Sequence, residues 1–470
     1  MFSSSLPTAA LLALLLPISP VSSQKIGTAV PEVHPKLTTQ TCTLASGCTT
    51  RQTRLVTDAL AHPLHAASDP SISCTSLPAS LCPDAATCAQ NCVLEGVEYS
   101  SLGVLAQGSA LTLRQYLFDG TQFKSVSPRL YLLAEDDHNY EPLKLLNAEL
   151  SFDVDVSKLG CGMNGALYLS EMDMSGSRSD LNPAGAQYGT GYCDAQCFTT
   201  NSFINGVANL NQSGACCNEM DIWEANGRAT VLTPHTCSSP GSFLCAGAEC
   251  NRTAAGSGVC DKDGCGINPY GLGAKKFYGP GLTVDTSRPF TVVTQFFTAD
   301  NSSAGTLSEI RRVYVQDGRE IPNTAETTST KLGAGFDGSI TDAYCAARNR
   351  SDFARLGGMK GMGESLARGM VLIFSIWNSD GDFMSWLDGM DNGPCNATEG
   401  DPTIIRARTP DVAVTFSNIR WGEIGSTFNV SATGGEAKAA ALTVASAGGV
   451  VGVMTGSVVG LAVLVGMLLW

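Results

Sequence analysis

Residues 216–226 read Cys-Cys-Asn-Glu-Met-Asp-Ile-Trp-Glu-Ala-Asn, and three carboxylates fall within six residues of what otherwise resembles a β-strand. Strand alternation places Glu219, Asp221 and Trp223 on one face, and Met220 and Ile222 on the opposite, core-facing side. Strict alternation would also turn residue 224 into the core and bury an unpaired glutamate charge, which is costly. We therefore predict a β-bulge near 222–223 that returns this glutamate to the face of the other two acids.

The rest of the chain is typical of an all-β protein. Gly and Pro are abundant, at 50 and 21 of 470 residues, and only 15% of the residues are charged, which disfavours long helical arrays. Stretches of β-branched and aromatic residues bounded by turn residues recur at 150–156, 290–296, 313–316, 370–377 and 412–419. Loops are expected at 179–191 and 246–264, and one modest helix at 363–368. Since no repeat or linker interrupts this pattern, we predict one large antiparallel β-sandwich.

The two ends of the sequence differ from the part between them. Residues 1–23 are uncharged and apolar, which predicts a secretory signal peptide, although no positive charge precedes the apolar run. Residues 439–470 also contain no charge and follow small residues and a short polar stem, 429–438. This order is typical of a glycosylphosphatidylinositol (GPI) anchor signal. A retained membrane helix and a soluble form are the alternatives, and the folded domain is expected to span 24–428.

Cysteines and glycosylation sequons indicate the secretory pathway. The 18 cysteines are an even number and are best explained as nine disulfides. A zinc site at Cys245 and Cys250, or at Cys260 and Cys265, is a weaker interpretation, because an oxidising lumen consumes thiols and the chain has only five histidines. Six Asn-x-Ser/Thr sequons predict glycosylated surface loops, at Asn211, Asn251, Asn301, Asn349, Asn396 and Asn429.

The net charge limits the possible partners. At −14, the chain repels nucleic acid and anionic membrane surfaces, so neither is expected as a partner, and membrane contact is expected only through the C-terminal anchor. A neutral polysaccharide is compatible with this charge. The sequence implies no metal and no organic cofactor, and we expect a monomer.

The acids of the 216–226 segment suit the cleavage of a sugar linkage. Two carboxyl groups about 5–5.5 Å apart can split a glycosidic bond with retention, one as nucleophile and the other as acid and base. Glu219 and Glu224 are the candidates for this pair, and Asp221 is placed to share a proton with Glu219. The alternatives without catalysis are that the three acids form a solvated strand edge or bind a cation. The double cysteine and Trp223 weaken them, because both fix the segment inside a structured core.

The segment 216–226 resembles the catalytic strand of glycoside hydrolase family 7, the fungal cellobiohydrolases and endo-β-1,4-glucanases. Further segments resemble the family in the same order, at 151–156, 161–168, 188–197, 232–235, 263–270, 277–281 and 415–427. The similarity covers roughly residues 30–428. It implies a curved, jelly-roll-type β-sandwich whose concave sheet and long loops form an open substrate cleft.

The resemblance also implies roles for individual residues. Glu219 matches the nucleophile, Glu224 the acid and base, and Asp221 the assisting carboxylate, while His235 matches a histidine on the leaving-group side. Polar residues that match those bonding glucose hydroxyls are Asn164, Tyr168, Tyr192, Asp194 and Gln196. Trp377 and Trp386 match tryptophans that stack on sugars on the two sides of the scissile bond, as aromatic faces suit pyranose rings. Trp421 and Trp223 are expected to be structural.

The family pattern further implies how the cysteines pair. The expected disulfides are Cys42–Cys48, Cys74–Cys92, Cys82–Cys88, Cys161–Cys395, Cys193–Cys217, Cys197–Cys216, Cys237–Cys260, Cys245–Cys250 and Cys265–Cys345. Two of them would tie the catalytic strand to the loop 192–196 and so fix the geometry of the site.

Departures from the family pattern refine the expectation. Before the double cysteine, cellobiohydrolases carry a long insertion, and this insertion covers the cleft. The corresponding segment here consists only of residues 209–215. In the family, an arginine often follows Asn-Pro-Tyr, but the residue at this position here is Gly271. A sugar-binding donor on the leaving-group side is therefore missing. The segment 58–65 lacks the tryptophan of the far glycone end, and no cellulose-binding module is present.

These features favour an anchored endo-β-1,4-glucanase that acts with retention on cellulose or related β-glucans. A surface transglycosylase or hydrolase acting on mixed-linkage glucan or xylan is the alternative within the enzymes. A non-catalytic, lectin-like glucan-binding protein and a purely structural wall protein are alternatives from other classes. The intact acids argue against both, because neither needs an acid and base pair.

Overall fold

The computed structural model describes residues 24–251, 256–325, 336 and 338–430. The predicted signal peptide, the anchor segment 439–470 and the stem from 431 onward lie outside these residues. The described residues belong to one compact unit that ends at Val430. None of their helices is long and apolar enough to cross a membrane.

Among the described residues, fifteen strands form one hydrogen-bonded sheet, which confirms the all-β prediction. Its main path runs β19 (Thr230–His235), β18 (Glu219–Ala225), β14 (Asn164–Ser170), β26 (Met370–Trp377), β11 (Arg129–Leu133), β3 (Gly47–Thr57), β2 (Lys36–Thr43), β27 (Ala413–Gly422), β13 (Ala148–Asp155), β23 (Phe290–Thr298), β24 (Leu307–Gln316) and β25 (Arg319–Pro322). Off this path, β12 (Pro142–Leu143) pairs with β26, and β7 (Val104–Gln107) and β8 (Ala110–Arg114) extend from β27. The five strands expected from the sequence correspond to β13, β23, β24, β26 and β27.

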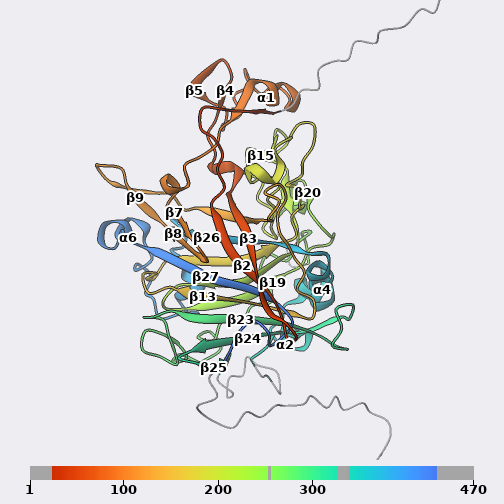
Figure 1. Cartoon of the computed structure of the whole chain (residues 1–470), viewed down its shortest axis with the longest axis vertical. Coiled ribbons are helices and arrows are strands. Elements are labelled where there is room, and N and C mark those ends of the chain that lie inside the picture. The colour runs from red at the N-terminus through yellow and green to blue at the C-terminus, as the bar shows by residue number, and fades with distance from the viewer. Residues whose placement is uncertain (1–23, 252–255, 326–335, 337, 431–470) are drawn as a thin grey trace, which may run out of the picture. The chain divides into compact units, whose positions relative to one another are not determined.

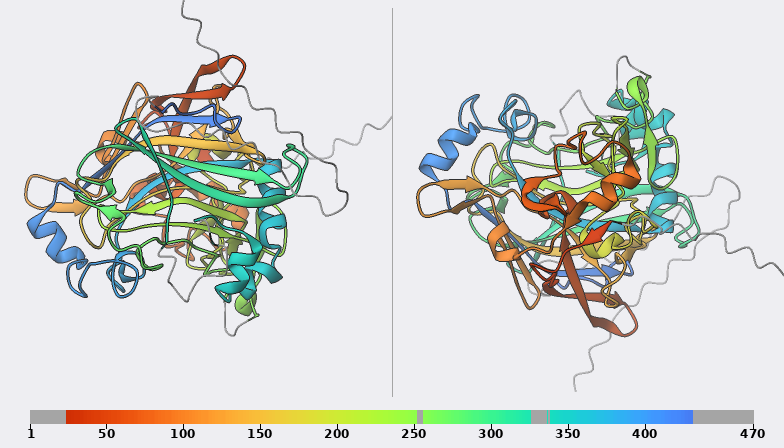
Figure 2. Two further views of the ribbon diagram at one scale, coloured as in Figure 1. Left: turned by 90° about the horizontal axis from the view of Figure 1, so that it is seen from below. Right: turned by 90° about the horizontal axis from the view of Figure 1, so that it is seen from above.

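The sheet doubles over on itself into two layers (Figures 1 and 2). Large rings meet between the layers, with Phe152 of β13 against Trp223 of β18 at 6.2 Å between centroids. Phe374 of β26 lies 5.7 Å from Phe416 of β27 in the same way. These side chains are completely buried, and the apolar area that they remove from water is the main stabilisation of such a sandwich.

The turn from one layer to the other is made by β2 and β3, the long red strands of Figure 1. Strand β2 pairs antiparallel with β3 but parallel with β27, with Thr41 opposite Trp421. The other pairings within the described part of this sheet are antiparallel. The predicted antiparallel sandwich is therefore correct except at this one junction.

Smaller elements surround the sandwich. A separate sheet of β1 (Lys25–Ile26), β6 (Cys92–Leu94), β4 (Leu64–Ala66) and β5 (Asp69–Ser73) follows the end of β3, beside α1 (Ala85–Asn91). Two-stranded ribbons are formed by β9 (Tyr116–Phe118) with β10 (Phe123–Ser125), β15 (Phe203–Ile204) with β16 (Val207–Ala208), β17 (Gly214–Cys216) with β20 (Phe243–Cys245), and β21 (Tyr278–Gly279) with β22 (Val284–Asp285). The remaining α-helices are α2 (Asp342–Ala347), α3 (Ser351–Arg355), α4 (Gly358–Arg368), α5 (Ser385–Asp388) and α6 (Pro402–Arg408). The helix predicted at 363–368 is the second half of α4.

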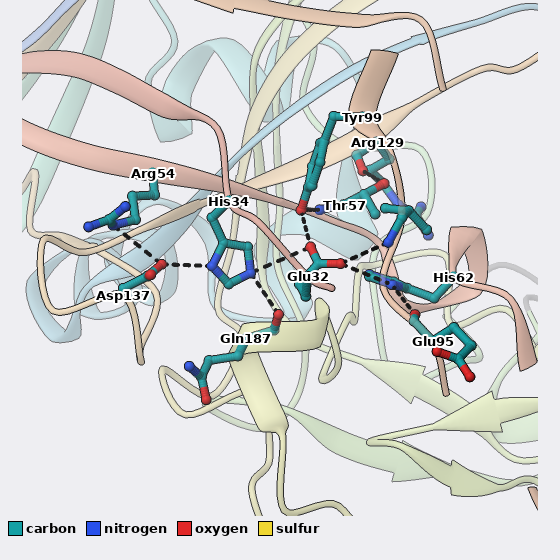
Figure 3. A network of polar contacts seen from close by, with 11 residues as sticks. Glu32, His34, Arg54, Thr57, His62, Glu95, Tyr99, Arg129, Asp137 and Gln187 are labelled. Carbon is teal, nitrogen blue, oxygen red and sulfur yellow. Dashed lines mark hydrogen bonds and ion pairs between the residues drawn. The ribbon is translucent and has the colours of Figure 1, made fainter. Parts of the chain in front are cut away.

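A buried network of polar side chains joins the segment before β2 to the loops at the end of β3 (Figure 3). His34 contacts the carboxylate of Asp137 at 2.7 Å and the carbonyl oxygen of Gln187 at 2.8 Å. Glu32 accepts hydrogen bonds from the hydroxyl of Tyr99 at 2.6 Å and from the backbone N–H of Val97 at 3.1 Å. Glu32 and His34 are thus held by hydrogen bonds, whereas β1 earlier in the same segment is held by strand pairing with β6.

Disulfides and sequons lie as the sequence led us to expect. The nine disulfides join the same pairs that the resemblance implies, and no cysteine is left free. A zinc site at Cys245 and Cys250 or at Cys260 and Cys265 is therefore excluded, because their sulfurs are bonded. The six sequon asparagines are all exposed and so accessible to a glycan.

Candidate active site

The three acids of β18 are brought to one face by an irregularity in the strand. Between Asp221 and Glu224 the register to β19 shifts, since Asp221 pairs with Thr233 while Glu224 pairs with Val231. The register to β14 shifts at the same place. One extra residue on β18 accounts for both shifts, so the β-bulge near 222–223 is present.

The bulge corrects one detail of the sequence analysis. Alternation placed Trp223 on the face of the acids, but its side chain is completely buried in the core between the layers. Its ring contacts Phe152, Tyr278, Phe290 and Tyr314 in edge-to-face geometry. The bulge turns two successive side chains, Ile222 and Trp223, into the core, and Glu224 can then face the same side as Glu219 and Asp221.

The acids open into a cavity of about 1130 Å³. Side chains from β18, β19, β14 and β26 form its floor, and loops form its walls. Of the predicted site residues, Glu219, Asp221, Glu224, His235, Tyr168, Tyr192, Asp194, Gln196, Trp377 and Trp386 line it. Asn164 is the one predicted binding residue that does not.

Glu219 is held by the loop that precedes its strand. Its Oε2 accepts a hydrogen bond of 3.0 Å from the backbone N–H of Ala195. The disulfides Cys193–Cys217 and Cys197–Cys216 fasten this loop to the start of the strand. Burial raises the pKa of Glu219 well above its usual range, and the charges of Asp221 and Asp194 add to this, whereas the cation of His235 and the Ala195 N–H oppose it.

Asp221 pairs with a histidine of the neighbouring strand. Its Oδ2 lies 3.0 Å from Nε2 of His235, and Nδ1 of His235 contacts the carbonyl oxygen of Asp261 at 2.8 Å. Burial alone would lower the pKa of His235, but the hydrogen bond and charge of Asp221 raise it to about 10. His235 is therefore a cation at neutral pH. The partner that the structure gives Asp221 is thus His235, and the sharing of a proton between Asp221 and Glu219 stays a prediction.

Glu224 is held by Asn164, whose side-chain nitrogen donates to its Oε1 at 2.9 Å. The amide oxygen of Asn164 accepts from the backbone N–H of Ala225 at 3.1 Å, so both ends of the amide are used. The Asn164 side chain is completely buried and orients Glu224 rather than facing a sugar. Burial raises the pKa of Glu224 to about 8, the charge of Asp221 adds to this, and the Asn164 hydrogen bond and the His235 charge oppose it.

The predicted sugar-binding residues form a connected group beside Glu219. The hydroxyls of Tyr168 and Tyr192 lie 3.1 Å apart, and Tyr192 donates to Oδ2 of Asp194 at 2.8 Å. Burial raises the pKa of Asp194, against the hydrogen bond from Tyr192 and the charge of Arg129. Gln196 donates from its side chain to the carbonyl oxygen of Lys262 at 2.9 Å.

Trp377 and Trp386 present aromatic surface to the cavity. Their ring centroids are 6.4 Å apart and the planes are inclined by 30°. Trp377 ends β26 and Trp386 lies in α5, so the platform joins the sheet to a loop helix. Aromatic faces arranged in this way suit the C–H faces of neighbouring pyranose rings.

Cationic residues of the cavity were missed by the sequence analysis. Arg129 of β11 lies with its guanidinium carbon 3.7 Å from the Tyr192 ring centroid and pairs with Asp58. Lys262, Arg348 and Arg350 line another part of the cavity. No local pattern marks these residues, because their partners are distant in the sequence. Of the residues in these contacts, only Asp58 lay in a segment that the sequence analysis had singled out, because it begins the segment 58–65 that departs from the family pattern.

Comparisons with known proteins agree with this geometry. The family model described as glycosyl hydrolase family 7 matches residues 26–428. A probable endo-beta-1,4-glucanase celB of Aspergillus terreus is 58% identical over 418 residues, which cover 88% of this chain and 96% of that protein. Endoglucanase EG-1 of Humicola insolens is 47% identical over 416 residues, 87% of this chain and 92% of that protein.

Solved structures give the same result. The native structure of Humicola insolens endocellulase EGI has a TM-score of 0.81 at 46% identity, and covers 86% of this chain and 100% of that chain. A family 7 cellobiohydrolase from Daphnia pulex has a TM-score of 0.80 at 35% identity, with the same coverage. The backbone is thus shared by both kinds of cellulase, and the identity is higher to the endocellulase. The chain belongs to glycosyl hydrolase family 7.

Proposed function

We propose that this protein is an endo-acting, retaining β-1,4-glucanase that hydrolyses cellulose or related β-glucans. The observation that carries the proposal is the placing of Glu219 and Glu224 on one face of β18, both opening into the same cavity. Relatives named endo-beta-1,4-glucanase at 58% and 56% identity support the same activity.

The environments of the two glutamates suit different roles. Glu224, with a pKa of about 8, is protonated at neutral pH and can give its proton to the leaving oxygen. Glu219 is the proposed nucleophile because it matches the family nucleophile in sequence; burial raises its pKa, and the Ala195 N–H and the His235 cation act against that rise by favouring its ionised form. Asp221 acts through His235, whose charge it maintains.

The reaction then proceeds in two displacements. In the first, a carboxylate oxygen of Glu219 bonds to the anomeric carbon while the glycosidic bond breaks and the leaving oxygen takes the proton of Glu224. In the second, Glu224 removes a proton from water, the water oxygen bonds to the anomeric carbon, and the ester to Glu219 breaks. The anomeric configuration is inverted twice and so retained.

Internal cutting is proposed from the loops. Between the disulfide-linked Cys197 and Cys216 lie the β15–β16 ribbon, a short turn and the start of β17. The long insertion by which cellobiohydrolases cover the cleft is missing from 209–215. A chain of glucan can therefore enter from the side rather than by threading from an end.

The test uses the secreted domain with carboxymethylcellulose, following viscosity and reducing ends together. A fast fall in viscosity with few new ends is expected, together with a product that is initially the β-anomer by NMR. Glu219→Gln should abolish turnover of an aryl cellobioside, while the exposed Glu320→Gln on β25 should leave it unchanged. Turnover by Glu219→Gln equal to the wild type would refute the assignment. No turnover by the wild type itself would favour a lectin-like protein.

A second measurement separates hydrolysis from transglycosylation. Addition of a cellooligosaccharide acceptor should leave the products largely hydrolytic, because water reaches the open cleft. Longer products that form in proportion to the acceptor would favour the transglycosylase alternative. Mixed-linkage glucan and xylan serve as competing substrates in the same assay.

The disulfides and the composition of the two ends of the sequence support a proposal for the cellular location. Nine disulfides require an oxidising compartment, and the chain is a secreted protein. We propose that residues 1–23 are its signal peptide and that 439–470 are exchanged for a GPI anchor. Release of active enzyme from cells by a phosphatidylinositol-specific phospholipase C would support the anchor, and activity found only in the medium would refute it.

A further inference from the structure

Two arginines line the cavity from a loop that the catalytic residues do not use. Arg348 ends α2 and Arg350 precedes α3. The disulfide Cys265–Cys345 and a hydrogen bond of 2.9 Å from the Tyr344 hydroxyl to the carbonyl oxygen of Gly266 fasten this loop. It therefore lies beside the segment 263–272, which the family pattern places on the leaving-group side.

The charges of these two arginines are not neutralised by an ion pair. Within the described ranges, neither guanidinium lies in a salt bridge, and the Nε atom of each is buried without a hydrogen-bond partner. The side-chain hydrogen bond of Arg348 goes to the neutral hydroxyl of Tyr344. By contrast, Arg129 in another part of the cavity pairs with Asp58, and Arg355 on α3 pairs with Asp352 at 3.2 Å.

The third cation near the two arginines, Lys262, differs from them because a carboxylate acts on its charge. Lys262 lines the same region and donates to the carbonyl oxygen of Gln196, which is uncharged. Asp194 and Asp263 also line the cavity, and the charge of Asp194 acts on Lys262, while the catalytic acids lie further along β18. Arg348 and Arg350 are thus the guanidinium groups of this cavity that pair with no carboxylate among the described residues, in a chain with a net charge of −14.

Gly271 stands where the family pattern often has an arginine, so this position offers no side-chain donor. A Cβ atom at Gly271 would lie 2.8 Å from Oδ1 of Asn392, so the Asn392 side chain would have to shift to admit one. The donors at this end come instead from the α2–α3 loop. A guanidinium offers paired N–H groups in a planar fork that matches a carboxylate better than an isolated hydroxyl.

We infer that Arg348 and Arg350 form a leaving-group subsite for carboxylates, so that the enzyme favours β-1,4-glucan chains with acidic substituents on the departing end. This inference rests on the proposed function, since it concerns the substrate class of the same cleft. It predicts that the advantage of an acidic chain is electrostatic and is reduced by salt.

The experiment compares carboxymethylcellulose with hydroxyethylcellulose of equal chain length and degree of substitution, at low and at high salt. The double variant Arg348→Gln/Arg350→Gln should lose about fivefold to tenfold in kcat/KM on the acidic polymer at low salt, and keep its rate on the neutral polymer within about twofold. The salt dependence seen with the acidic polymer should largely disappear. Asn349 remains a glycan acceptor in the variant, because glutamine is tolerated at the middle position of its sequon.

Arg355→Gln is the matched control, because it removes a cation from the same segment that is paired and does not line the cavity. It should leave the ratio of the two rates unchanged. An equal loss of the double variant on both polymers, or a loss on neither, would overturn the carboxylate subsite while wild-type turnover keeps the proposed function intact. A wild type that cuts neither polymer would refute the proposed function and the inference with it.

Discussion

The side-chain nitrogen of Asn164 lies 2.9 Å from Oε1 of Glu224 and donates a hydrogen bond to it across the β14–β18 pairing. This bond ties the proposed acid and base to the adjacent strand of the same sheet. It also favours the ionised form of Glu224, in opposition to burial. Asn164 thereby both orients the acid and moderates its pKa.

Asn164→Ala is therefore expected to change the pH profile as well as the rate. Loss of the donor raises the pKa of Glu224 further, so the alkaline limb of kcat/KM moves to higher pH. At the optimum, kcat should fall about tenfold to a hundredfold, because a mispositioned acid transfers its proton poorly. Asn226→Ala is the control, since this buried asparagine bonds Met163 and Asp388 instead of the acid. An alkaline limb that moves equally in both variants would contradict the assignment.

The wild-type alkaline limb should report Glu224 itself. Its pKa is raised from 4.5 to about 8, so the protonated fraction, and with it kcat/KM, falls as the pH rises through about 8. A substrate whose leaving group needs no proton, such as 2,4-dinitrophenyl cellobioside, should lack this limb for the first displacement. Profiles for this substrate and for a cellooligosaccharide, measured side by side, test the role. The same alkaline limb with both substrates would assign it to another group.

How far the sequence could predict this site depends on the kind of contact. The bulge in β18 followed from the cost of burying Glu224, because that cost is local to one strand. The position of Trp223 was wrong because alternation was counted through the bulge, which changes the parity by one residue. The resemblance supplied the cysteine pairs, which spacing alone leaves undetermined.

Contacts between segments that are distant in the chain could not be predicted from the sequence. Asn164 was expected to meet sugar, and only its register opposite β18 shows that its amide is used within the protein. The loop that carries Arg348 and Arg350 is held at the cavity by the disulfide Cys265–Cys345, whose two cysteines are 80 residues apart in the sequence. The parallel pairing of β2 with β27 joins segments at opposite ends of the domain, and no local periodicity predicts it.

The Asp221–His235 pair should make the stability of the protein depend on pH in a defined direction. The pKa of His235 is raised from 6.5 to about 10, so its contribution to stability is complete below pH 6.5 and is lost as the pH rises towards 10. His235→Gln should thus destabilise by about 3–5 kcal/mol near pH 6, because it leaves Asp221 buried and unpaired, and by less near pH 10. Denaturant unfolding at the two pH values measures this. His138→Gln, at an exposed histidine, should have a small effect at both. An effect of His235→Gln that is larger at pH 10 would contradict the pairing.

The buried network around His34 is expected to stabilise one end of the domain without taking part in the chemistry (Figure 3). His34→Ala removes one partner of Asp137, which keeps Arg54, and takes away the donor to the Gln187 carbonyl; this should cost about 1–3 kcal/mol and lower the Tm by a few degrees. Because Tyr99 links Glu32 of this network to the backbone of Thr57, the end of β3 should loosen as well.

Hydrogen exchange in the His34→Ala variant should then increase at 24–35 and 57–66 but not at β18. Turnover of an aryl cellobioside should stay within about twofold of the wild type, since that substrate occupies only the centre of the cleft. His138→Ala provides the control in the same region, and faster exchange throughout the sandwich would show that the network instead supports the whole fold.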